Sequence, residues 1–276
     1  MEKNNDIHNY KILTIYSVIA YVSAYLVIFL TYNITTALVA SSYNIKTLLN
    51  INKLIYITED RSLLWTFDSV FSVFSSGTII LIILLLVLMK IFNKRKDHLG
   101  LVKIFFFWLI VHCINRIIGL FILGTIFNLY LSNLVLTWLY FEYLPTISLV
   151  ITAMFLLIFI GSKTTRPLLI SAKSSKFVEK RKRLFFIWSQ GIKVWFFSSI
   201  IIFLLHLPSF SLIENFLSIT MFVLVLPSYF NHKNISIPIS SRESEEPKYK
   251  IPWKHILFSL IFIVVFKVIF TIGIKF

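Results

Sequence analysis

The chain has 276 residues, of which 58% are hydrophobic and 28 are phenylalanine, and it carries a formal net charge of +15. Soluble domains are about 45–50% apolar, so this composition indicates a protein surrounded by lipid rather than by water. The apolar stretches lack strand-period alternation, which argues against an outer-membrane barrel. Basic residues that flank membrane spans account for the charge without a nucleic-acid partner.

Several apolar stretches are long enough to cross a bilayer as helices. A helix rises 1.5 Å per residue, so about 20 residues span a hydrocarbon core of about 30 Å. The sequence predicts an all-α transmembrane bundle that forms one integral membrane domain over residues 1–276, with about seven spans; six or eight spans also fit. The predicted spans are residues 12–32, 69–92, 101–127, 146–161, 184–207, 211–230 and 255–274.

The first predicted span follows a short segment of mixed charge. Lys3 and Lys11 alternate there with Glu2 and Asp6. The apolar run that follows is too long for the core of a typical signal peptide. We therefore interpret it as an uncleaved membrane anchor.

Residues 33–68 form the longest loop between predicted spans. Ile45, Leu48, Leu49 and Ile55 recur there at roughly helical spacing. Apolar residues at that spacing are typical of an amphipathic helix. The pattern predicts a helix that lies in the membrane interface.

Residues 128–143, after the third span, are apolar and rich in Tyr and Trp. These two residue types favour the headgroup level of a bilayer. We expect an interfacial or re-entrant helix that leads to Pro145. A full span here would divide the basic segments of the chain between the two sides of the membrane, which favours seven spans.

The basic residues predict the orientation. The segments 1–11, 90–103, 162–184 and 231–254 hold 20 of the 27 Lys and Arg residues, and only four lie on the opposite side. Basic residues are retained on the cytoplasmic side, so the N-terminus is expected in the cytoplasm. The abundance of Ile, Phe, Lys and Asn resembles an AT-rich coding bias, which favours a bacterial cytoplasmic (inner) membrane.

A polar stripe on the third span is the sharpest constellation in the sequence. His112, Asn115, Arg116 and Gly119 have offsets that place them on one helical face. An Arg at the centre of a span costs about 2.5–3.5 kcal/mol on insertion scales, so a compensating interaction is expected. Gly119 would allow a neighbouring helix to approach closely.

Other ionisable residues lie at a similar predicted depth. Glu142, Glu214 and Lys267 join His112, Asn115 and Arg116 as a candidate intramembrane polar site, and His206 ends the fifth span nearby. Such residues mark substrate sites or proton paths by default. Two simpler alternatives are that Arg116 pairs with Glu142 or Glu214 to hold helices together, and that Lys267 extends outward along its stem.

The basic segment 162–184 suggests contact with anionic lipids. Six of its cations are candidates to hold lipid headgroups: Lys173, Lys176, Lys180, Arg181, Lys182 and Arg183. Each base near such a surface contributes about 1 kcal/mol. The alternative is that these residues only fix the orientation of the chain.

Several well-known catalytic motifs are missing from the sequence. It has no H-E-x-x-H, no G-x-S-x-G and no Gly-rich phosphate loop. We predict no catalytic residues, no metal and no cofactor, and the single Cys113 excludes an internal disulfide. These observations favour a non-catalytic membrane component or subunit, with membrane-protein partners or as a homo-oligomer. A small-solute or lipid transporter built around Arg116, or an intramembrane enzyme that acts on a lipid-borne substrate, are the alternatives.

Overall fold

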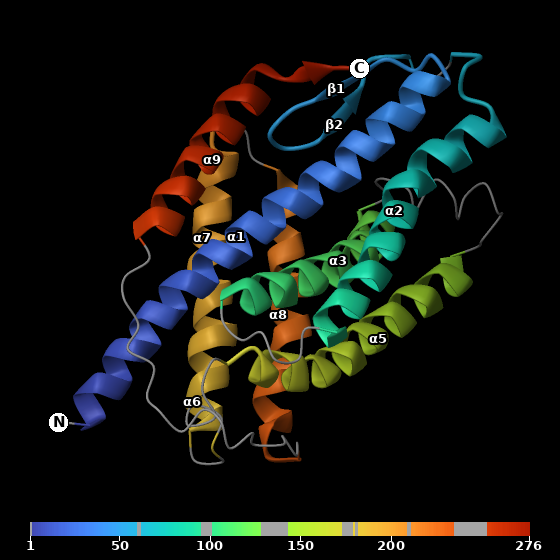
Figure 1. The fold of residues 1–276 in the computed structure, drawn as a ribbon. Coiled ribbons are helices and arrows are strands. Elements are labelled where there is room, and N and C mark those ends of the chain that lie inside the picture. The colour runs from blue at the N-terminus through green and yellow to red at the C-terminus, as the bar shows by residue number, and fades with distance from the viewer. Residues whose placement is uncertain are drawn as a thin grey trace.

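The computed structural model describes residues 2–59, 62–94, 101–127, 143–172, 179, 182–208, 211–234 and 253–276. Within them the fold is a helical bundle, which confirms the predicted all-α class (Figure 1). The helices are α1 (Glu2–Ser42), α2 (Phe67–Lys94), α3 (Leu101–Ile126), α5 (Tyr143–Ile170), α6 (Arg183–Ile187), α7 (Lys193–His206), α8 (Leu212–Phe230) and α9 (Trp253–Ile272).

The helices are those of a multi-pass membrane protein. In the described part of the chain, six helical segments are long and apolar enough to cross a bilayer. One of them, Arg183–His206, is continuous through α6, the short π-helix η2 (Trp188–Ile192) and α7. In α9 the shorter apolar stretch Ile256–Ile272 adds a seventh segment. A bundle of about seven spans agrees with this set.

The first helix is much longer than the span predicted at residues 12–32. Helix α1 has 41 residues, which is about 60 Å at 1.5 Å per residue. It ends where Asn44 takes a positive φ of 59° and the Ile45 N–H donates to the Ala40 carbonyl at 3.0 Å. A left-handed residue with such a bond is a common helix C-terminus. The extra length lets α1 pack against α2, α3, α7 and α9.

The prediction of an interfacial helix around residues 45–55 is wrong. The segment folds as a β-hairpin of β1 (Thr47–Leu49) and β2 (Leu54–Tyr56). Its turn is held by Asn50, whose Oδ1 accepts the backbone N–H groups of Asn52 and Lys53 at 2.9 and 2.8 Å. Asn side chains commonly form such turns, and the turn prevents helix formation there.

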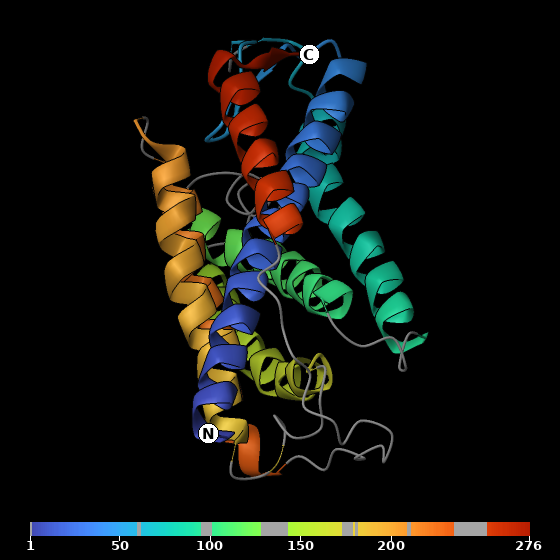
Figure 2. The ribbon, with the colours of Figure 1, turned by 60° about the vertical axis from the view of Figure 1, so that its left-hand side comes forward.

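A third strand from the far end of the chain completes this small sheet. Strand β3 (Ile274–Lys275) pairs antiparallel with β1, in the order β2-β1-β3. Gly273, with φ 84°, makes the turn from α9 into β3. Its ideal Cβ would lie 2.9 Å from Leu48 Cδ1, so a side chain there would meet the hairpin. The sheet lies at the end of the bundle opposite the N-terminus (Figures 1 and 2).

The core of the bundle forms where α1, α3 and α8 meet. Helix α3 packs against both α1 and α8, and α5 packs on α3 and α8. Trp108, the largest fully buried side chain among the described residues, belongs to α3. The helix predicted at residues 128–143 lies outside the described residues, apart from Tyr143, which begins α5.

Candidate functional site: a buried ion pair and its hydrogen-bond chain

The centre of the polar core is an ion pair between α3 and α8. Arg116 donates from Nη1 to Glu214 Oε2 at 3.0 Å and from Nη2 to Oε1 at 2.8 Å. The two side chains are only 6% and 5% exposed. Two parallel charge-assisted bonds are the strongest arrangement for this pair. Of the two partners considered for Arg116, Glu142 and Glu214, the structure shows the pair with Glu214.

The start of α8 places Glu214 for this contact. Ser211 is the N-cap residue, and its side chain accepts from the Glu214 N–H at 3.4 Å. Ser-x-x-Glu is the sequence of a capping box, in which the Glu side chain usually turns back to the cap. Here the carboxylate bonds Arg116 instead. The positive end of the helix dipole also favours a carboxylate in this first turn.

Two aromatic rings of α1 pack against the Arg116 guanidinium. Its carbon lies 5.1 Å from the centroid of Phe29 and 5.0 Å from that of Tyr32. A cation held near ring faces gains about 0.5–2 kcal/mol, more when it is shielded from water. Arg116 therefore joins three helices: α3, which carries it, α8 through Glu214, and α1 through the rings.

A chain of hydrogen bonds continues from Glu214 to the hairpin. Tyr25 donates from its hydroxyl to Glu214 Oε2 at 2.9 Å. The single phenolic proton is then committed, so the Tyr25 oxygen accepts from His206 Nε2 at 2.8 Å. His206 Nδ1 lies 2.6 Å from Asn52 Oδ1 in the hairpin turn. Because Nε2 already donates to Tyr25, a hydrogen bond from Nδ1 to this oxygen needs the doubly protonated ring. Asn52, His206, Tyr25, Glu214 and Arg116 thus form one continuous buried chain.

The other polar residues of the predicted α3 stripe face α8 and α1. Asn115 donates to the Leu217 carbonyl at 2.9 Å and accepts from Thr220 Oγ1 at 2.8 Å. Gly119 permits this contact, since an ideal Cβ there would lie only 2.7 Å from Thr220 Oγ1. The His112 ring packs edge-on against Tyr21 of α1 at 4.4 Å between centroids.

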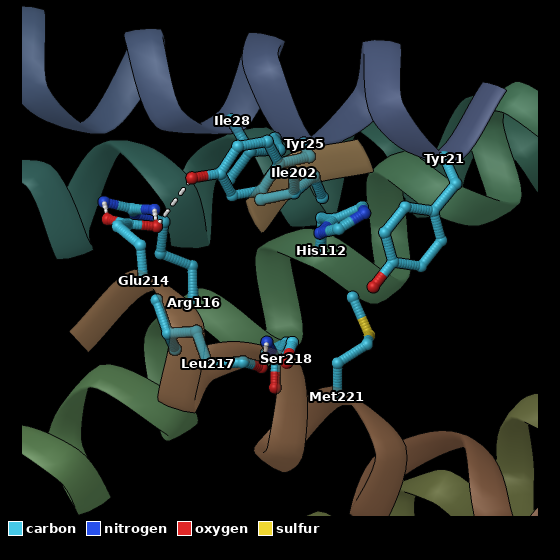
Figure 3. A pocket seen from close by; sticks show the side chains of 11 residues that line it. Tyr21, Tyr25, Ile28, His112, Arg116, Ile202, Glu214, Leu217, Ser218 and Met221 are labelled. Carbon is cyan, nitrogen blue, oxygen red and sulfur yellow. Dashed lines mark hydrogen bonds and ion pairs between the residues drawn. The ribbon is translucent and has the colours of Figure 1, made fainter. Parts of the chain in front are cut away.

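A small cavity lies beside the ion pair (Figure 3). Its volume is about 20 Å³, and His112, Asn115, Arg116, Ser218 and Met221 are among its lining residues. A cavity needs about 10–15 Å³ on this measure to hold one water, whereas small-molecule sites are typically about 300–1,000 Å³. The space beside Arg116 is therefore of the size of a water molecule.

A second hollow lies between α1 and α2 and opens outward. It has a volume of about 430 Å³ and contains three serines of α2. Ser72 accepts from the Tyr43 hydroxyl at 3.0 Å, and Ser75 and Ser76 donate to carbonyls of their own helix at 2.6 and 2.7 Å. The hydroxyl protons of Ser75 and Ser76 are thus used within their own helix, and the remaining lining is mainly apolar.

The other predicted site residues lie apart from this core or outside the described residues. Lys267 is partly buried on α9 and does not line the cavity. Glu142 falls outside the described residues. At the start of α6, Lys182 is partly buried, whereas Arg183 is only 6% exposed. The other four bases predicted to contact lipid are outside the described part, so lipid contact stays a prediction.

Two members of the hydrogen-bond chain were not predicted from the sequence. Tyr25 lies in an apolar run with many aromatic residues, and no local signal distinguishes it. Asn52 lies in the turn of the hairpin, within a segment predicted as a helix. The depth of His206 was noted, but its partners come from elements distant in the sequence.

We looked for a metal site and for known relatives that could identify the role of this core. Among the described residues, no group of three or more His, Cys, Asp or Glu side chains is arranged to hold a metal ion. No family model, curated protein or solved structure matches the chain. The interpretation of the core therefore depends on its geometry.

Proposed function

We propose that this chain is a non-catalytic membrane component, either a scaffold or a subunit of a larger assembly, in which Arg116 and Glu214 fasten helices together. The observation that carries the proposal is the bidentate bond between the two side chains beside a cavity of only about 20 Å³. A transporter or an intramembrane enzyme needs space for its substrate next to the charged groups.

The physical cost of burying charge explains why both partners are needed. Removing one member of a buried ion pair leaves an uncompensated charge and costs about 3–5 kcal/mol. Replacing both members by apolar residues of similar size is often neutral or stabilising. A pair that only fastens helices should therefore tolerate the double replacement and not the single ones.

The test replaces Arg116 by Met and Glu214 by Leu, singly and together. We expect each single variant to lose abundance in the membrane and to unfold at a lower temperature, and the double variant to recover both. Cys113 supplies the measurement, because this single cysteine is 0% exposed and reacts with a thiol-specific dye when the bundle opens. Single variants that are as abundant and stable as the unmodified protein would refute a fastening role.

We also propose that the N-terminus lies in the cytoplasm and that the membrane is a bacterial inner membrane with anionic lipids at its cytoplasmic face. The unequal distribution of basic residues supports the orientation. The ribbon is compatible with it, since the N-terminus and α6 lie at one end and the hairpin and C-terminus at the other (Figures 1 and 2).

A further inference from the structure

Within the described part of the chain, two buried polar atoms beside the ion pair lack a hydrogen-bond partner. They are His112 Nε2 and Arg116 Nε, and both residues line the cavity of about 20 Å³. The side chains are deeply buried, with 6% exposure for His112 and 5% for Arg116. Buried polar atoms are almost always paired with protein or ordered water, so two orphans at one cavity require an explanation.

The neighbouring polar groups are already bonded to one another. Both terminal nitrogens of Arg116 bond Glu214, and Asn115 uses its amide for Leu217 and Thr220. A rotation of these side chains would break an existing bond for each new one. None of these described side chains can therefore become the partner of the two orphan atoms without losing a bond that it already makes.

The two orphan atoms have complementary roles. Arg116 Nε carries a hydrogen and can only donate. His112 has a hydrogen bond with the backbone of Tyr21, and Nε2 has no partner, so this bond involves Nδ1. Inside a helix the carbonyl is the available acceptor, which makes Nδ1 the protonated nitrogen and leaves the Nε2 lone pair of a neutral ring as an acceptor. One site thus presents a donor and an acceptor together.

A single water molecule in this cavity has the hydrogen-bonding groups that both atoms need (Figure 3). It would accept from Arg116 Nε–H and donate to His112 Nε2. Buried waters typically make about three hydrogen bonds. We propose that this cavity is a binding site for one structural water, which bridges Arg116 and His112 within α3.

The bound water extends the hydrogen-bond chain across the bundle. Without it the chain ends at Arg116; with it the chain runs from Asn52 in the hairpin through the ion pair to His112 and Tyr21 of α1. The site therefore gives His112 a role that needs neither a metal nor a substrate. This inference does not depend on whether the chain is a scaffold.

A direct test uses protein labelled with ¹⁵N-arginine in lipid bilayers. We expect magnetisation transfer from water to the Arg116 Nε–H signal, which is assigned by its absence in the double variant of Arg116→Met with Glu214→Leu. In His112→Leu, which removes the acceptor, this transfer should fall. No transfer to Arg116 in the unmodified protein would overturn the proposal.

A hydrated cavity and a dry cavity predict opposite changes in the unfolding temperature when the cavity is partly filled. Ser218→Thr adds one methyl group to the lining and displaces the water, so a hydrated site predicts a lower unfolding temperature in the Cys113 dye assay. A dry void would be filled by the same methyl group, and the unfolding temperature would stay or rise. Ser148→Thr, at an exposed position of α5, is the control for the change from serine to threonine. An unchanged or raised temperature for Ser218→Thr, relative to this control, overturns the proposal.

Discussion

Glu214 accepts three hydrogen bonds from two residues, and these donors stabilise its negative charge inside the bundle. Two come from Arg116 and one from the Tyr25 hydroxyl. Hydrogen bonds to charged groups contribute about 1.5–3 kcal/mol, more than those between neutral groups. Tyr25 also holds His206, so it is the link between the ion pair and the hairpin.

Tyr25→Phe tests that link at the residue scale. The ring stays, but Glu214 loses a donor and His206 Nε2 is left without its acceptor, so we expect a loss of about 1–3 kcal/mol in the free energy of unfolding. Tyr43→Phe is the matched control, because it removes one bond to a neutral Ser72 in a less buried place. Denaturant unfolding monitored at Cys113 provides the measurement. Equal losses in the two variants would contradict a special role for Tyr25.

Helical periodicity made part of the core predictable at this scale. The offsets between His112, Asn115 and Arg116 placed them on one face, and the depth of Glu214 made it a candidate partner. Tyr25 could not be chosen among the aromatic residues of α1, because a sequence gives the depth of a residue in the membrane but not the helix that it faces.

Helices α5 and α8 approach each other closely at Gly161. An ideal Cβ on Gly161 would overlap the backbone carbonyl oxygen of Leu224, and its distance to the Leu224 carbonyl carbon would be 3.1 Å. Backbone atoms cannot rotate away as a side chain can. Any residue larger than glycine at this position must push the two helices apart. Small residues are common where membrane helices approach closely.

Gly161→Ala should therefore destabilise the bundle. Forced separation of packed elements costs about 1–3 kcal/mol, and we expect a lower unfolding temperature. Gly191→Ala is the control, since its nearest neighbour is a side-chain atom, Val225 Cγ1, at 3.3 Å. If Gly161→Ala unfolds at the temperature of the control or above it, the close packing of α5 on α8 is refuted.

The helices were largely predictable, and the sheet was not. Apolar stretches of the required length indicate membrane helices because the bilayer leaves few other structures for such a segment. The hairpin depends on a turn at Asn50 and on pairing with β3, which lies more than two hundred residues away. The spacing of Ile45, Leu48 and Leu49 is compatible with a helix when that distant strand is unknown.

For the whole molecule, the orientation is a prediction that single cysteines can test. In a Cys113→Ala background, Lys53→Cys in the hairpin and Lys163→Cys near the end of α5 both replace exposed side chains. We expect a membrane-impermeant thiol reagent to label position 53 in intact cells and position 163 only in inverted vesicles. The reverse pattern would place the basic segments outside and contradict the proposed topology.

We expect the polar core to be closed to solutes from both sides of the membrane, and the reactivity of a thiol at Met221 measures this. Met221 lines the cavity beside Arg116 and is 1% exposed. In the Cys113→Ala background, Met221→Cys should resist an impermeant thiol reagent from both sides of the membrane and react only after denaturation, while Lys53→Cys reacts throughout. Labelling of folded Met221→Cys from either side would show a water-filled path to the ion pair and contradict the account in favour of a transporter.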